Sequence, residues 1–159
     1  MSQAIINTAI TVRQMVIRQI DAIPEEIYDV QPAAFNNTIR WNMGHIVTCL
    51  DGLLSKGLPF NSGLPENYGA LFGTGTKPAD WTATPPSKAE LVQYLNQQVA
   101  GLAAVTPAVL EEKLQTPIQL GPLKFETAGE LFNFSIVHET MHSSAISALA
   151  KVIKYEQAK

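Results

Sequence analysis

The residues best suited to chemistry lie near the C-terminal end, in the segment His138-Glu139-Thr140-Met141-His142. This segment reads H-E-x-x-H inside a long pattern of helical periodicity. Two histidines four residues apart leave the same face of an α-helix, about 40° from each other. Apolar residues, Met141 among them, share that face and are expected to point to the core, so the two imidazoles must lose water and find partners. Neutral imidazoles at this spacing are a common first pair of ligands for a divalent transition metal.

The third and last histidine of the chain is His45, inside a second predicted helix over residues 38–56. This helix is expected to be buried on two faces, and His45 lies on the second of them. Three histidines can bind one face of a tetrahedral or octahedral ion and leave other positions open. If the two helices pack side by side, His45, His138 and His142 converge on one point. The alternative is that all three are core histidines, hydrogen-bonded to buried backbone or hydroxyl groups. We favour the divalent metal site.

Three further residues near the histidines have more than one interpretation. Cys49, one turn after His45, is either a fourth ligand that would close the site or, as we favour, a small buried apolar residue. Trp41 and Cys49 are both candidates for lining a substrate pocket. Glu139 would be the general base of a zincin-type hydrolase. Those enzymes take their third ligand downstream, and no histidine follows His142 here, so we expect Glu139 only to support or flank the ligands.

Composition narrows the classes of protein that the chain can be. At 159 residues it is long enough for one domain over residues 1–159 with a proper core. The net charge is −3 and no basic cluster appears, which argues against a nucleic-acid surface. The single cysteine excludes an internal disulfide framework and fits a reducing compartment. Neither a signal peptide nor a membrane-spanning run is apparent, so we expect a cytoplasmic protein with no membrane partner.

The elements that must position the histidines are helices. Apolar residues at three- and four-residue spacing, together with caps and breakers, predict helices over residues 3–21, 38–56, 88–105 and 128–155. Asn37 or Thr38 can cap the second helix. Ser87 and Thr127 begin capping boxes for the last two. Residues 57–86 form a long connection rich in glycine and proline, with one helical turn near 66–72. The pattern predicts an all-α four-helix bundle with a long crossover between helices 2 and 3 and a short extended segment before helix 4.

This layout resembles the DinB-like (DinB/YfiT) superfamily of small bacterial four-helix proteins. Residues 37–46, which read N-T-I-R-W-N-M-G-H-I, are similar to the tryptophan–glycine–histidine stretch on the family's second helix. The pair His138 and His142 is similar to its H-x-x-x-H pair, and Gln31-Pro32 and the crossover also match. Ser143-Ser144 differs, because many members have a basic residue and a glycine there. The substrate contact expected at that position is therefore not carried over.

The resemblance implies a divalent metal, zinc or nickel, bound by His45, His138 and His142, and a homodimer. Some relatives are metal-dependent thiol S-transferases that join bacillithiol, mycothiol or a similar low-molecular-weight thiol to an electrophile, and others are thiol-dependent isomerases. We therefore expect a small-molecule thiol and an electrophile as partners. The alternatives are a non-catalytic metal-binding or stress-related bundle protein and, with less support, an H-E-x-x-H metal hydrolase.

Overall fold

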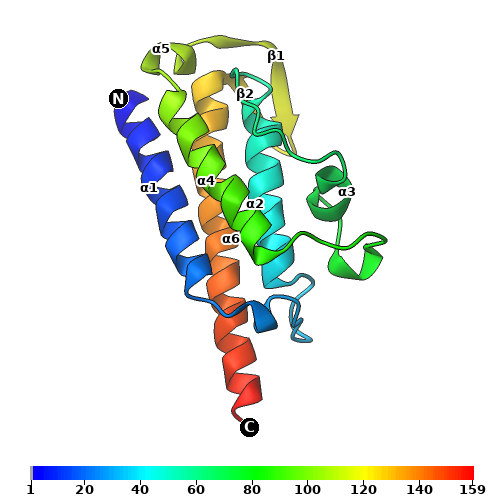
Figure 1. Cartoon of the computed structure of the whole chain (residues 1–159). Helices are drawn as coiled ribbons and strands as arrows, with labels where there is room; N and C mark the ends of the chain where they lie inside the picture. Colours follow the sequence, from blue (N-terminus) through cyan, green and yellow to red (C-terminus); the bar gives the residue numbers. More distant parts are fainter. Residues whose placement is uncertain (1) are drawn as a thin grey trace.

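The computed structural model describes residues 2–159, most of which are helical (Figure 1). The four long helices are α1 (Ser2–Asp21), α2 (Ile39–Leu54), α4 (Lys88–Ala104) and α6 (Ala128–Gln157). The shorter elements are the 3₁₀ turns η1 (Glu25–Ile27) and η2 (Pro78–Asp80), helices α3 (Tyr68–Phe72) and α5 (Pro107–Leu110), and strands β1 (Lys113–Leu120) and β2 (Leu123–Thr127). The predicted long helices are each within two residues of these limits. The all-α expectation thus agrees with a mostly helical chain that carries one small sheet.

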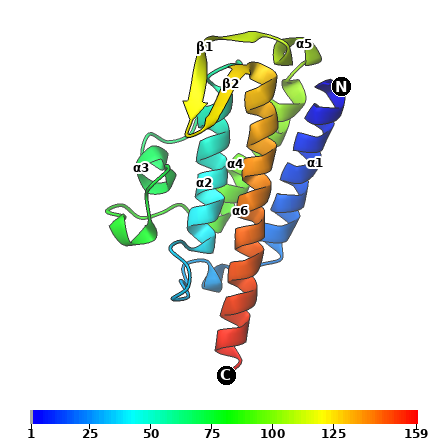
Figure 2. The ribbon, with the colours of Figure 1, turned by 180° about the vertical axis from the view of Figure 1, so that it is seen from behind.

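The four long helices lie side by side, with α6 against α2 and α1, and with α4 against the same two helices (Figures 1 and 2). The C-terminal turns of α6 extend beyond the ends of the other three (Figure 2). Apolar side chains from all four helices fill the space between them, and these include Ile20, Ile39, Met43, Ile46, Leu91, Leu95, Ile146 and Leu149. Because this packing fixes α2 against α6, it also determines how their histidines meet.

Side-chain caps set where the long helices begin. Thr38, rather than Asn37, caps α2 by accepting a hydrogen bond from the backbone N–H of Trp41. Thr127 forms the complete capping box predicted for α6. At Ser87 only half of the predicted box forms, because the carboxylate of Glu90 accepts a hydrogen bond from the Tyr68 hydroxyl instead.

The connection between α2 and α4 folds back over α2 and is anchored by its aromatic residues. Phe72 and Tyr68 of α3 are buried, and Trp81 donates a hydrogen bond from Nε1 to the carbonyl oxygen of Leu71 at 2.7 Å. The Phe72 ring lies directly on Gly44 of α2, where an added Cβ would come within 2.4 Å of it. Glycine at this position allows the close approach. The second apolar face of α2 is therefore covered by the chain itself.

Strands β1 and β2 form an antiparallel hairpin beside the first turns of α6 (Figure 2). The pairs include Ile118 with Phe125 and Leu120 with Leu123, and Gly121 supplies the positive φ of +57° at the turn. The hairpin corresponds to the predicted extended segment, whereas α5 and the two 3₁₀ turns had no clear sequence signal. Within residues 2–159, no helix is both long and apolar enough to cross a membrane.

Candidate metal centre

The structure brings the three histidines of the chain to one place between α2 and α6. One ring nitrogen from each of His45, His138 and His142 lies within 4.8 Å of the other two. The ring centroids are 4.5 to 5.1 Å apart. His45 is buried, while His138 and His142 are partly exposed, so the cluster opens on the α6 side. The convergence predicted from the helical spacing is thus present.

A backbone group of the crossover orients His45. Its Nδ1 lies 2.6 Å from the carbonyl oxygen of Phe72, at the end of α3. A carbonyl oxygen can only accept, so Nδ1 carries the proton and donates, and the lone pair of Nε2 stays free. The indole of Trp41 stacks on the same imidazole with centroids 4.5 Å apart and an angle of 15° between planes. Trp41 is in turn held by donation from its Nε1 to Thr76 Oγ1 at 2.9 Å.

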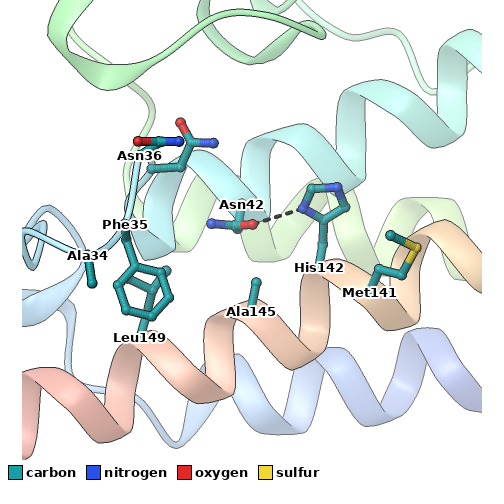
Figure 3. Close-up of a pocket in the computed structure, with 9 residues that line it drawn as sticks. Ala34, Phe35, Asn36, Asn42, Met141, His142, Ala145 and Leu149 are labelled. Atoms are coloured by element: carbon teal, nitrogen blue, oxygen red, sulfur yellow. Dashed lines mark hydrogen bonds between the residues drawn. The ribbon is translucent and has the colours of Figure 1, made fainter.

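A side chain of α2 orients His142 in the same way. Nδ1 of His142 lies 2.8 Å from Oδ1 of Asn42, as the dashed line in Figure 3 shows. The Asn42 amide cannot be turned around, because its Nδ2 donates to the carbonyl oxygen of Thr38 at 2.8 Å. Oδ1 must accept, so His142 also carries its proton on Nδ1 and leaves Nε2 free. Metal-binding histidines almost always donate their other ring N–H to such an acceptor.

The three imidazoles are held in their neutral form. Burial and, to a smaller extent, the repulsion between neighbouring histidines together lower the pKa of His138 and His142 to about 4. Burial also lowers the pKa of His45. Neutral imidazoles have lone pairs to offer a cation, so the donor set and its protonation both fit a divalent transition metal.

Cys49 lies against His45 but outside the cluster of ligand atoms. Its Sγ is 3.4 Å from Nε2 and 3.6 Å from Nδ1 of His45. Nearly equal distances to both nitrogens place the sulfur over the ring face rather than in line with either lone pair. Burial raises the pKa of Cys49 to about 11, so it is a neutral thiol at pH 7. In the described part of the chain the three histidines alone form the candidate cluster.

Glu139 does not point toward the cluster. Successive residues of an α-helix are about 100° apart, so the residue after His138 leaves α6 on another face. Its carboxylate is buried, and Oε1 lies 2.9 Å from Nε of Arg13 in α1. The carboxylate is therefore not placed as the general base that an H-E-x-x-H hydrolase needs, and any support it gives the ligands is through α6 rather than by contact with them.

A groove of about 430 Å³ opens beside His142 (Figure 3). It is lined by apolar side chains and amides: Ala34, Phe35, Asn36, Asn37, Asn42, Met141, Ala145 and Leu149. Sequence periodicity placed Met141 on the core-facing side, but the residue is 65% exposed at the rim of this groove. A second hollow of about 580 Å³ lies beside Trp41 and shares Asn36 and Asn37 with the first. None of the three asparagines was predicted to line a pocket; Asn36 and Asn37 precede the α2 cap, and Asn42 lies in the first turn of α2.

Together, these features describe a mostly helical protein with a three-histidine site suited to a divalent ion. The chain belongs to the DinB superfamily, whose sequence profile matches residues 9–146. That span contains α2, α4 and all three histidines. No curated protein was found to match the chain.

Proposed function

We propose that His45, His138 and His142 bind one divalent ion, zinc or nickel, in a single domain over residues 1–159. The observation that carries this proposal is the pair of fixed tautomers. Phe72 and Asn42 each accept a hydrogen bond from Nδ1, which leaves the Nε2 lone pairs of His45 and His142 free for a cation. Core histidines without a metal would also need hydrogen bonds. Their other ring nitrogens, however, would have no reason to lie close together.

We further propose that the protein is a metal-dependent thiol S-transferase. A divalent ion on three neutral ligands keeps its full charge, so it would lower the pKa of a ligating thiol below the usual value of about 8.5. In the reaction the S–H proton passes to solvent and a bond forms between sulfur and carbon. At a saturated carbon the leaving group departs with its electron pair, whereas at an activated C=C the π electron pair moves to the adjacent carbon, which takes up a proton from solvent. DinB membership and the partly exposed side of the cluster support this reading. Glu139 gives no support to water activation, because it is paired with Arg13.

The groove beside His142 suits an uncharged electrophile. Phe35, Ala145 and Leu149 offer an apolar surface, and none of the lining side chains carries a fixed charge. The exposed amide of Asn36 on the groove lining would donate to or accept from a hydroxyl or amide of the substrate. Trp41 has an indirect role here, since it stacks on His45 and borders the neighbouring hollow.

A conjugation assay tests the transferase proposal. Metal-loaded wild type and His142→Ala are compared with bacillithiol, mycothiol, coenzyme A, cysteine and glutathione as thiols. N-ethylmaleimide and 3-maleimidopropionate provide a neutral and an anionic electrophile. We expect the wild type to accelerate at least one thiol with the neutral maleimide, and His142→Ala to lose that acceleration. Equal rates for both proteins with every thiol would leave a non-catalytic metal-binding protein.

We also propose a cytoplasmic homodimer built from DinB-type four-helix bundles. The second face of α2 is covered within the chain and offers nothing to a partner. The remaining support is on α6, where Val137 and Met141, 49% and 65% exposed, form an apolar pair one turn apart. Light scattering at micromolar concentration would return twice the chain mass of 17.3 kDa for a dimer. A mass near that of one chain would exclude a stable dimer.

A further inference from the structure

A buried polar network behind the metal site connects all four long helices. It starts at Glu139 of α6, whose Oε1 lies 2.9 Å from Nε of Arg13 in α1. Nη1 of Arg13 donates to Oε1 of Gln98 in α4 at 2.9 Å. Nε2 of Gln98 donates to the backbone carbonyl oxygen of Val47 in α2 at 2.8 Å. Arg13 and Gln98 are fully buried and Glu139 is 4% exposed.

This network is a poor source of stability. Burial raises the pKa of the Glu139 carboxyl and lowers that of Arg13, while the attraction between the two groups opposes both shifts. The contact between Arg13 and Glu139 is an ion pair without good hydrogen-bond geometry, since Nε and Nη2 of Arg13 and Oε1 of Glu139 are all buried without a hydrogen-bond partner. Replacing such a pair with apolar residues of similar volume is often neutral or stabilising. The network therefore calls for another explanation, and fixing the register of packed helices is the best-attested use of buried polar groups.

The two ends of the network lie next to the histidine ligands. Glu139 directly follows His138, and Val47 is two residues after His45. A slip of α6 by one helical turn would move its side chains about 5.4 Å along the axis. That distance exceeds the 4.8 Å within which the three ligand atoms lie, so a slip of one turn would separate the histidines of α6 from His45. Such a slip would also break the contact between Arg13 and Glu139, so the network and the metal site depend on the same register.

We propose that Arg13, Gln98 and Glu139 are positioning residues, which hold α6 in the register and rotation that bring His138 and His142 to His45. They act at a distance from the ligands, where α6 packs against α1 and α2 packs against α4. The proposal depends on metal binding at the three histidines, and does not depend on the thiol reaction.

The first test replaces the whole network by apolar residues, in the variant Arg13→Met/Gln98→Leu/Glu139→Met. The thermal midpoint of the metal-free protein is expected to stay the same or rise. The affinity for Co²⁺ is expected to fall at least tenfold, and the visible absorption bands of the bound Co²⁺ to shift. A control, Lys124→Met/Glu126→Met, removes an exposed ion pair on the hairpin and should alter neither quantity. A triple variant with wild-type affinity and wild-type absorption bands would overturn the proposal.

Gln98→Leu is a second test in case the triple variant does not fold. It removes the bond that Gln98 donates to Val47 of α2 and the bond that it accepts from Arg13, but it leaves Arg13 and Glu139 paired, so no charge is buried alone. We expect a folded protein that binds Co²⁺ several-fold more weakly. Gln98→Glu keeps an acceptor for Arg13 but has no N–H to donate to Val47, so it should not restore the affinity. Unchanged Co²⁺ affinity in a folded Gln98→Leu protein would contradict the positioning role. A wild type that binds no Co²⁺ would overturn the metal site itself and the positioning role with it.

Discussion

Asn42→Ala removes the side chain that orients His142 and leaves the ligands themselves intact. Oδ1 of Asn42 accepts the Nδ1 proton of His142 at 2.8 Å, so its loss frees both the tautomer and the rotation of the ring. Removing such a supporting partner typically weakens metal affinity about 10- to 100-fold, which is about 1.4 to 2.8 kcal/mol. We expect a loss in this range for Zn²⁺.

Asn42→Ala should destabilise the fold only slightly, so the loss of Zn²⁺ affinity can be measured on folded protein. The carbonyl oxygen of Thr38 keeps a partner, because it also accepts from the backbone N–H of Asn42 at 3.1 Å. His142 is partly exposed, so water can replace the lost acceptor. Two side-chain hydrogen bonds are lost, worth about 1 kcal/mol each. Chemical denaturation of the metal-free protein measures this separately from binding.

Asn96→Ala is the matched control for Asn42→Ala. Asn96 forms the same kind of bond within its helix, from Nδ2 to the carbonyl oxygen of Val92 at 2.9 Å, but it is exposed on α4 and touches no histidine. Competition against a chromophoric chelator gives Zn²⁺ affinities for wild type and both variants. We expect Asn96→Ala to match the wild type. If Asn42→Ala also bound Zn²⁺ within twofold of the wild type, the orienting role of Asn42 would be refuted.

Two further predictions concern pH and packing. His138 and His142 have a pKa of about 4 when folded and about 6.5 when unfolded, so the unfolded chain binds protons first as the pH falls. Metal-free protein should therefore lose stability from pH 6.5 toward pH 4, and His138→Gln/His142→Gln should lose less; equal melting profiles would contradict this. Gly44→Ala should destabilise by roughly 1–3 kcal/mol and weaken metal binding, because its Cβ meets the Phe72 ring. Gly52→Ala, with open space around it, should be neutral or stabilising by urea titration.

The sequence predicted the helices and the histidine cluster because both depend on local periodicity. Two histidines at i and i+4 must share a face, and a third on a neighbouring helix needs only side-by-side packing to join them. The capping residues Thr38 and Thr127 likewise act within a few residues of themselves. For such features the distance along the chain largely determines the distance in space.

The parts that sequence reasoning missed depend on long-range packing. The partner of Glu139 is Arg13, and nothing in the H-E-x-x-H motif indicates that α1 carries a buried cation. The acceptor for His45 is a backbone carbonyl of Phe72, which has no signature in the sequence at all. Met141 was assigned to the buried face because periodicity gives a direction around the helix but not the extent of the neighbouring helices.

The metal content of the protein tests the central claim most directly. Protein purified without a polyhistidine tag is measured by elemental analysis, together with His45→Ala, His138→Ala, His142→Ala and, as a control, Cys49→Ala. We predict one divalent ion per chain in the wild type, sharply reduced content in each histidine variant, and full content in Cys49→Ala, whose sulfur lies outside the cluster. Full metal content in all three single histidine variants would contradict the assignment of the site.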